Sequence, residues 1–420
     1  MKQRGNIFWK RTLTCVLALM LALTGCGSPG GDLMAGVRGR EKESQVDLNG
    51  PGAQAAADFS IKLLNAALEK NPGQNALFSP LSALCALAMT ANGAAGDTRA
   101  QFEALLGLPV EELCQYLSAY CAALPSGEKY QFHGANSLWL REGGVQVKRE
   151  FLEANAGLFG AAVFEKPFDS GTLEEINGWV EEQTKGMIPT ILQEIKPEEV
   201  LYLINALAFE AEWADIYEDA QVRERLFTQE DGAEVPVDMM ESTENLYLED
   251  EKATGFLKYY AGEQYAFGAL LPKEGVTLGD YLKELDGQGL RQVLQGAQER
   301  EIIAGIPKFQ QECGYQLGEA LRGMGLTDAF DPAAADFSAL GQGAGEEPLY
   351  IGQVVHKTFL SVYEKGTQAG AATAVGIEAG SIQAEEPPRV VLNRPFLYML
   401  VDAKTMTPVF IGTAYAPAQS

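Results

Sequence analysis

The sequence predicts an α+β domain with a large mixed β-sheet and surrounding helices. Apolar residues recur at helical spacing in the stretches 58–70 and 80–92, which indicates helices. Residues 201–209 are short and almost continuously apolar, as in a strand that is covered on both faces. Two more strand-like segments, 354–363 and 396–400, enclose a long stretch rich in small residues. Helices and strands are therefore expected to pack around a common core.

The N-terminus has the features of a secretory signal. A basic segment precedes the apolar run 13–23, and Leu23-Thr24-Gly25-Cys26 follows. The run is shorter than the roughly 20 residues that a transmembrane helix needs, and this order of segments is typical of a signal peptide. Its last residues resemble the bacterial lipobox, which implies cleavage before Cys26 and a diacylglycerol on its sulfur. We expect residues 1–25 to be a lipoprotein signal peptide, and the mature protein to be exported and membrane-anchored, at the cell surface or extracellular.

Residues 26–53 are rich in Gly, Ser, Asp and Glu and lack apolar periodicity, which predicts a flexible tether. No second linker of this kind follows, so residues 54–417 are expected to form one domain, acting as a monomer. The formal charge of −25 becomes −29 when the four basic residues of the signal peptide are removed. So acidic a protein is not expected to bind nucleic acid or anionic lipid through charge, and its membrane attachment would depend on the lipid at Cys26.

The cysteines of the domain are expected to be buried free thiols. They are Cys85, Cys114, Cys121 and Cys313. Cys114 and Cys121 are about 10 Å apart along an expected helix, which is too far for a disulfide. The spacing fits no zinc site, and only His133 and His356 could assist, so the sequence predicts neither metal nor cofactor.

The sequence lacks the motifs of common enzymes. It contains no G-x-S-x-G, H-E-x-x-H or Walker pattern, and any Ser-His-Asp triad would need one of two histidines. The glycine-rich segment 341–345 could be mistaken for a phosphate loop, but no helix pattern follows it, so a surface loop is expected. We therefore expect a protein that is not an enzyme.

Local signals place several elements of the domain. Ser79 and Pro80 are the N-cap and first turn of a helix that extends to about Asn92. A strand is expected at 135–140. Asn205 lies within the apolar strand 201–209, where an unsatisfied amide would cost a few kcal/mol, so it needs polar partners.

The stretch 362–395 connects two strand-like segments and has an unusual composition. Its first half consists largely of small residues, which by itself indicates a flexible loop. Thr367, Ala369 and Ala371 nevertheless alternate along one face of an extended chain, and no proline occurs before Pro387. The same residues could therefore enter a sheet interior, which would make the segment a two-state element.

These segments resemble the serpin family. The motifs E-K-G-T-x-A from Glu364 and N-R-P-F from Asn393 flank the small-residue loop, and N-x-x-x-S-P-x-S, G-A-x-G-x-T and N-x-W-V-x-x-x-T-x-G-x-I precede them in the family's order. The resemblance covers almost the whole domain and implies a serpin-like fold with an exposed reactive-centre loop at about 364–390. The hinge of that loop would comprise Glu364, Gly366, Thr367, Ala369, Gly370, Ala371 and Ala372.

The resemblance also implies two clusters in the main sheet. Ser79, Asn205 and His356 match the shutter, beneath the point where the sheet opens. Trp213 matches the breach at the top of the sheet. Taken alone, each polar residue could simply satisfy its own backbone, and Trp213 could belong to an ordinary core.

A serpin is a suicide inhibitor of serine proteases. A protease cleaves the loop, and the hinge inserts as a new strand before the covalent acyl-enzyme hydrolyses. The resemblance thus implies a covalent complex with a serine endopeptidase, and a papain-like cysteine protease is a less favoured target. The hinge contains no bulky, charged or proline residue between Thr367 and Ala372, although Gln368 and Gly370 depart from the commonest family pattern. The sequence is also compatible with a non-inhibitory serpin that is a binding or substrate protein, and with a surface lipoprotein that binds solutes.

The position of the reactive bond follows from the family's spacing. The hinge glutamate is usually the seventeenth residue before the cut, counted inclusively, and counting from Glu364 places the bond between Gly380 and Ser381, within one or two residues. The neighbours Glu378 and Ala379 supply neither a basic nor an aromatic side chain. Elastase-like or subtilisin-like targets are therefore favoured over trypsin-like and chymotrypsin-like ones, and a shift to Glu378 would suit a glutamate-specific protease.

Overall fold

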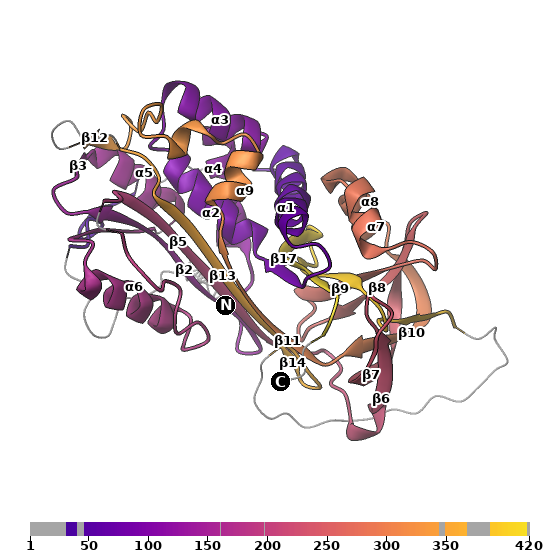
Figure 1. Ribbon diagram of the computed structural model, residues 1–420. Helices are drawn as coiled ribbons and strands as arrows, with labels where there is room; N and C mark the ends of the chain where they lie inside the picture. The colour runs from indigo at the N-terminus through magenta and orange to yellow at the C-terminus, as the bar shows by residue number, and fades with distance from the viewer. Residues whose placement is uncertain are drawn as a thin grey trace, which may run out of the picture.

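Two large β-sheets carry most of the strands in the computed structural model, which describes residues 31–39, 46–159, 161–196, 198–343, 349–367 and 387–417 (Figure 1). The main sheet has six strands in the order β11-β13-β5-β2-β4, and the short β14 pairs with β5. These strands are β2 (Tyr130–Arg141), β4 (Ala162–Lys166), β5 (Leu201–Glu212), β11 (Phe309–Gln316), β13 (Gln353–Val362) and β14 (Gly366–Thr367).

The second sheet has nine strands in the order β1-β17-β16-β9-β8-β7-β10-β15, with β6 paired to β7. They are β1 (Ala76–Phe78), β6 (Val222–Thr228), β7 (Glu234–Glu249), β8 (Ala253–Tyr259), β9 (Tyr265–Pro272), β10 (Gln298–Pro307), β15 (Arg389–Val391), β16 (Phe396–Asp402) and β17 (Thr407–Ala414). Separately, β3 (Val145–Val147) pairs with β12 (Gly341–Gly343).

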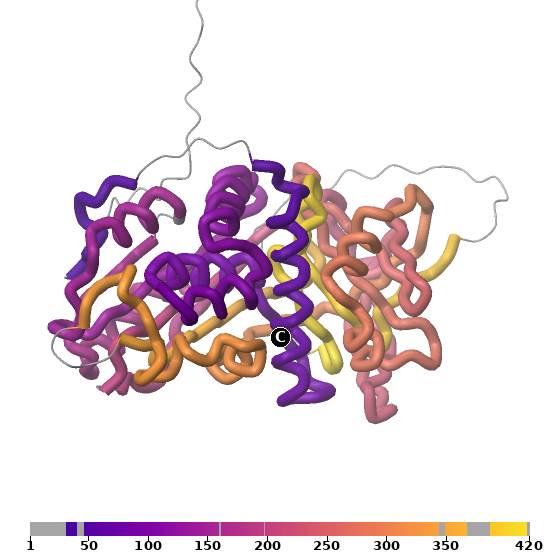
Figure 2. The backbone as a smooth tube through the Cα atoms, turned by 90° about the horizontal axis from the view of Figure 1, so that it is seen from above, coloured from indigo at the N-terminus to yellow at the C-terminus, as the bar shows by residue number. Residues whose placement is uncertain are grey.

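Helices cover both faces of the main sheet. Most lie on one face, and α6 lies on the other (Figure 1). Viewed from above, α1 crosses the middle of the molecule between the helices on one side and the second sheet on the other (Figure 2). The helices are α1 (Pro51–Lys70), α2 (Pro80–Ala91), α3 (Gly96–Leu106), α4 (Val110–Ala123), α5 (Arg149–Phe159), α6 (Ser170–Gln183), α7 (Leu278–Glu284), α8 (Gly287–Gln295) and α9 (Gly318–Gly323).

Strand β5 separates two hydrophobic cores. Leu201 and Leu203 belong to the large core beneath α1 and α2, whereas Tyr202 and Ile204 belong to a smaller core beneath α6. Successive side chains of a strand point to opposite faces, so a strand covered on both faces is expected to be apolar at nearly every position. The continuous apolar run therefore predicted β5 correctly, and the α+β fold class is confirmed.

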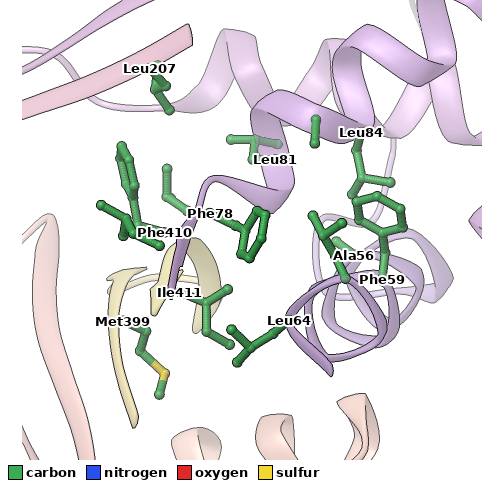
Figure 3. Packing of buried hydrophobic residues seen from close by; sticks show 14 of the residues in the cluster. Ala56, Phe59, Leu64, Phe78, Leu81, Leu84, Leu207, Met399, Phe410 and Ile411 are labelled. Carbon is green, nitrogen blue, oxygen red and sulfur yellow. The ribbon is translucent and has the colours of Figure 1, made fainter. Parts of the chain in front are cut away.

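The large core joins both sheets to the first two helices (Figure 3). Ala56 and Phe59 of α1 pack near Leu84 of α2, while Phe410 of β17 lies close to the start of α2. Ser79 caps α2 by accepting a hydrogen bond from the Ser82 amide, as the sequence predicted. The Ser79 hydroxyl also donates a hydrogen bond to the Val409 carbonyl of β17, which holds the N-terminus of α2 against that strand.

The structure differs from the expected tether between residues 26 and 53. Helix α1 begins at Pro51 rather than near residue 58, and Pro51 occupies its first turn. The amide of Leu33 also donates a hydrogen bond to the Val163 carbonyl of β4 (2.8 Å). Part of the stretch is therefore packed against the domain. The expected surface loop at 341–345 is also wrong in its first part, because β12 pairs there with β3.

The cysteines of the domain are all free, but not all are buried. Cys85 and Cys114 are buried as expected, whereas Cys313 is half-buried and Cys121 is exposed. The expectation was wrong for these two because burial depends on which side of a helix or strand faces the core. None of the helices in the described ranges is long and apolar enough to cross a membrane.

Candidate functional site

The candidate site begins with a tight turn at the end of β13. The Tyr363 amide donates to the Gly366 carbonyl (3.0 Å), and the Gly366 amide donates back to the Tyr363 carbonyl (3.1 Å). Glu364 and Lys365 therefore occupy the tip of a reverse turn. Gly366 has a φ of +141°, and a Cβ atom there would lie 2.0 Å from the Ala211 carbonyl oxygen. Only glycine fits this backbone conformation and this close approach.

The chain beyond the turn enters the main sheet as β14. Gly366 pairs with Glu212 and Thr367 with Ala211, both antiparallel to β5. Thr367 is completely buried, and its hydroxyl is 2.8 Å from the hydroxyl of Tyr260. Gly366 and Thr367 of the small-residue stretch are thus already part of the sheet.

β14 occupies the end of the sheet at which β5 and β13 stop pairing. The two strands run parallel, and their paired residues extend from Tyr202 opposite Gln353 to Ala208 opposite Phe359. Beyond that point β5 pairs with β14 instead. β14 therefore lies directly beyond the paired part of β5 and β13, on the same side of β5 as β13.

Trp213, directly after β5, holds the turn by two hydrogen bonds. Its indole Nε1 donates to the Tyr363 carbonyl (2.8 Å), and its amide donates to the Lys365 carbonyl (2.9 Å). The ring is buried and stacks on Tyr260, with centroids 4.4 Å apart. In this stacked pair, Trp213 binds the turn and Tyr260 contacts Thr367 of β14.

An ion pair holds the turn from outside. The Glu364 carboxylate lies 2.9 Å from Lys308 Nζ, and Lys308 also lies 3.0 Å from Asp238. Burial alone would lower the pKa of Lys308, but its contacts with the two carboxylates raise it overall. The tip of the turn is therefore tied through Glu364 to Lys308, which lies between β10 and β11.

Ser79, Asn205 and His356 come together farther down the sheet. His356 and Asn205 are direct partners across the parallel strands β13 and β5. The Asn205 carboxamide oxygen contacts His356 Nδ1, and His356 Nε2 lies 3.1 Å from the Ser79 amide nitrogen. The Ser79 hydroxyl donates to the Val409 carbonyl of β17 (2.9 Å). These bonds connect β5 and β13 to the start of α2.

The partners of His356 define its protonation state. A backbone amide can only donate, so Nε2 must accept from Ser79, and Nδ1 must carry the proton that is donated to Asn205. Complete burial lowers the pKa of His356 to about 3, because the charged form would lose its hydration. The imidazole is therefore neutral. Protonation of Nε2 would place its N–H against the N–H of Ser79, so that two donors would face each other.

Sequence reasoning missed two members of this cluster. The Asn205 amide group donates to the Ser82 carbonyl (3.1 Å) and also contacts the Ser82 hydroxyl and the Asn136 side chain. Asn136 is the partner of Asn205 across β2 and β5. An asparagine at position 136 in an expected strand was a signal for a second polar position, but its partner depends on strand register.

Several residues expected at the site lie outside the described ranges. They are the lipid-anchor Cys26, the hinge residues Ala369, Gly370, Ala371 and Ala372, and the reactive-bond residues Glu378, Ala379, Gly380 and Ser381. Among the residues that the structure describes, no group of three His, Cys, Asp or Glu side chains could hold a metal ion.

Comparisons with known proteins agree with this geometry. A family model described as serpin (serine protease inhibitor) matches residues 54–417. The native state of tengpin, a thermophilic serpin, is 43% identical and superposes with a TM-score of 0.87, covering 92% of this chain and 99% of that chain. Tengpin in its latent state gives a lower TM-score of 0.77, with 89% and 99% covered.

Two relatives with different roles also match. The leukocyte elastase inhibitor of Xenopus tropicalis is 29% identical, and the match covers 87% of this chain and 99% of the inhibitor. Human thyroxine-binding globulin, solved with its ligand, is 25% identical with a TM-score of 0.79, covering 89% of this chain and 100% of that chain. The family model matches most of the sequence, and the turn lies at the end of the main sheet where β5 and β13 stop pairing. The chain therefore belongs to the serpin family.

Proposed function

We propose that this protein is a suicide inhibitor of serine endopeptidases and not an enzyme. The observation that carries the proposal is β14, because Gly366 and Thr367 of the expected hinge are already paired with β5 where β5 and β13 separate. In the proposed reaction, the protease serine attacks the carbonyl of the reactive bond and forms an acyl-enzyme. The hinge then continues between β5 and β13 before water can hydrolyse the ester.

Backbone pairing would supply the free energy for trapping. Each new hydrogen bond contributes about 0.5 to 1.5 kcal/mol net, so a strand of about ten residues would gain on the order of 10 kcal/mol. That is enough to compete with refolding of a distorted protease active site. The small side chains from Thr367 to Ala372 can enter such a strand, although Gly370 would weaken it by about 0.5 to 1 kcal/mol.

A non-inhibitory serpin is the second candidate, supported by the similarity to thyroxine-binding globulin. Such a protein would bind a ligand or be cut as a plain substrate. The hinge favours the inhibitor, because it carries none of the bulky or charged residues that would hinder insertion. A surface lipoprotein that binds solutes has no such support.

The first prediction tests inhibition and the cut site together. We expect an elastase-like or subtilisin-like protease to form an SDS-resistant covalent complex and to release a fragment that begins at Ser381, or at another residue within 378–382. The physical reason is that Ala379 and Gly380 suit a shallow pocket, and that Glu378, Ala379 and Gly380 offer neither a long cation nor a ring. Incubation with a protease panel, followed by mass spectrometry of the released fragment, measures both.

Four outcomes would contradict parts of this prediction. Cleavage at that bond without a covalent complex would identify a substrate rather than an inhibitor. A trypsin-like enzyme as the fastest partner would refute the specificity, and a new N-terminus outside residues 378–382 would refute the bond assignment. Faster trapping of a papain-like cysteine protease would change the target class while leaving the insertion mechanism in place.

The second prediction concerns the membrane anchor. We propose that Cys26 carries a diacylglycerol in the mature protein and that residues 1–25 are removed, which would place the inhibitor at a membrane surface. Two or more acyl chains hold a protein there, whereas one chain alone binds reversibly. Mass spectrometry of the native membrane fraction should find a lipidated Cys26 at the N-terminus. Intact Met1 or an unmodified Cys26 would disprove the anchor, and Cys26→Ser should release the protein from the membrane.

A further inference from the structure

Helices α2 and α4 pack side by side and bring four polar or thiol side chains into two pairs. Cys121 Sγ of α4 lies 3.7 Å from Cys85 Sγ of α2. Cys114 Sγ, two turns earlier on α4, lies 3.5 Å from Oδ1 of Asn92, the residue that directly follows α2. The two pairs are in antiparallel register. Of the two cysteines of α4, Cys121 therefore faces another cysteine, whereas Cys114 faces an asparagine.

The Cys85–Cys121 pair combines a buried cysteine with an exposed one. Cys85 is 4% exposed, whereas Cys121 is an exposed residue close to the C-terminal end of α4. The sulfurs are already in contact, and a disulfide needs about 2.0 Å between them. Small changes in side-chain rotation at two helical positions can close the remaining distance, so no refolding of either helix is required.

We propose that Cys85 and Cys121 form a disulfide that links α2 to α4 when the protein meets a disulfide oxidant. The exposed Cys121 thiolate attacks oxidised glutathione, or the active disulfide of an oxidoreductase, and expels one thiolate. Cys85 then loses its proton and attacks Cys121 in the mixed disulfide, which expels the second thiol. Two cysteine thiols are oxidised to one disulfide, and one molecule of oxidised glutathione is reduced to two thiols.

Proton loss from Cys85 becomes easier during this sequence. The contact with Cys121, together with burial, raises the pKa of the Cys85 thiol in the reduced protein. Conversion of Cys121 to a mixed disulfide removes this thiol contact before Cys85 has to ionise. The order of steps, exposed thiol first and buried thiol second, therefore follows from the exposure of Cys121 and from the raised pKa of Cys85.

The link would restrain an important part of the fold. It closes a loop of 36 residues that contains α3 and most of α4. It also fixes α4 to the helix whose first residues contact both β5, through Asn205, and β13, through His356. A disulfide that closes a loop of this length lowers the entropy of the unfolded chain. Because the unfolding entropy of a domain of this size is large, the melting temperature should rise by only about 5 °C.

The test treats the full-length chain with excess oxidised glutathione and maps its peptides without reduction. We expect a cross-linked pair containing Cys85 and Cys121, a loss of two hydrogen atoms, two fewer maleimide-reactive thiols, and a melting temperature about 5 °C higher that dithiothreitol reverses. Cys121→Ala should abolish all four effects. It changes an exposed residue, so the variant should fold.

Cys114→Ala is the matched control, because Cys114 lies on the same helix but faces Asn92. This variant should still form the cross-link. A stable glutathione adduct on Cys121 beside a free Cys85 would overturn the proposal, as would unchanged reactivity of all thiols. Since none of these measurements involves a protease, failure here is distinguishable from failure of the inhibitory function.

Discussion

Thr367→Arg should convert the proposed inhibitor into a substrate. Thr367 is completely buried in β14 and contacts the Tyr260 hydroxyl, so an arginine there would bury an unpaired charge. The cost is several kcal/mol, and every 1.4 kcal/mol corresponds to about tenfold in a ratio of populations. The yield of covalent complex should therefore fall about a hundredfold or more, while cleavage of the reactive bond continues. Densitometry of complex and cleaved product against protease dose measures the ratio.

Thr367→Ser is the control for this experiment. It keeps a hydroxyl for Tyr260 and a small side chain for the sheet, so the complex yield should stay within about twofold of the wild type. If Thr367→Arg still forms complexes at the wild-type ratio, insertion through this position is not the trapping step.

His356 should make the protein sensitive to mild acid. Its pKa is about 3 in the fold because of burial, against about 6.5 in an unfolded chain. The unfolded chain therefore binds a proton that the folded protein excludes, so stability falls as pH drops below about 6.5 and continues to fall until about pH 3. Between about pH 7.5 and about pH 5.5 this histidine alone should remove about 1.4 kcal/mol from the free energy of unfolding. Urea unfolding at several pH values measures the loss.

His356→Ala should lose this acid sensitivity and also unfold more easily at neutral pH. Without the imidazole, the Ser79 amide and the Asn205 side chain each lose a buried partner, at a cost of about 1 to 3 kcal/mol. We expect the weakened contact between β5 and β13 to favour polymers on heating, which size-exclusion chromatography detects. His133→Gln is the matched control, since it removes the other histidine and should retain the effect of His356. An equal pH dependence in His356→Ala and the wild type would refute the assignment.

The sequence predicted the main elements because their signals are local. The apolar run of β5 and the cap formed by Ser79 and Pro80 both reflect short-range rules, and the structure has them as expected. The need of Asn205 for polar partners also followed from burial alone. Its partner His356 was expected only through the family resemblance, because the two residues are 151 positions apart.

What the sequence could not predict depends on register and on helix rotation. Asn136 reaches Asn205 only because β2 and β5 pair with those two residues opposite each other. Cys85 and Cys121 lie on different helices, so consideration of Cys114 and Cys121 along one helix could not reveal their contact. The turn at Gly366 was also hidden, because its positive φ becomes necessary only when the Ala211 carbonyl lies against it.

The pairing of β14 with β5 affects how fast the hinge strand can form in the main sheet, rather than how stable the finished strand is. A covalent intermediate that can be hydrolysed is trapped only if strand formation is faster than attack by water. The first residues of an ordered segment are the slowest to form, since conformational entropy is lost before many bonds compensate for it. Here Gly366 and Thr367 are already paired with Glu212 and Ala211, so in the proposed reaction that nucleation step would precede the encounter with a protease. Growth of the strand could then begin at once after cleavage, and the fraction of protease molecules that escape would be correspondingly small.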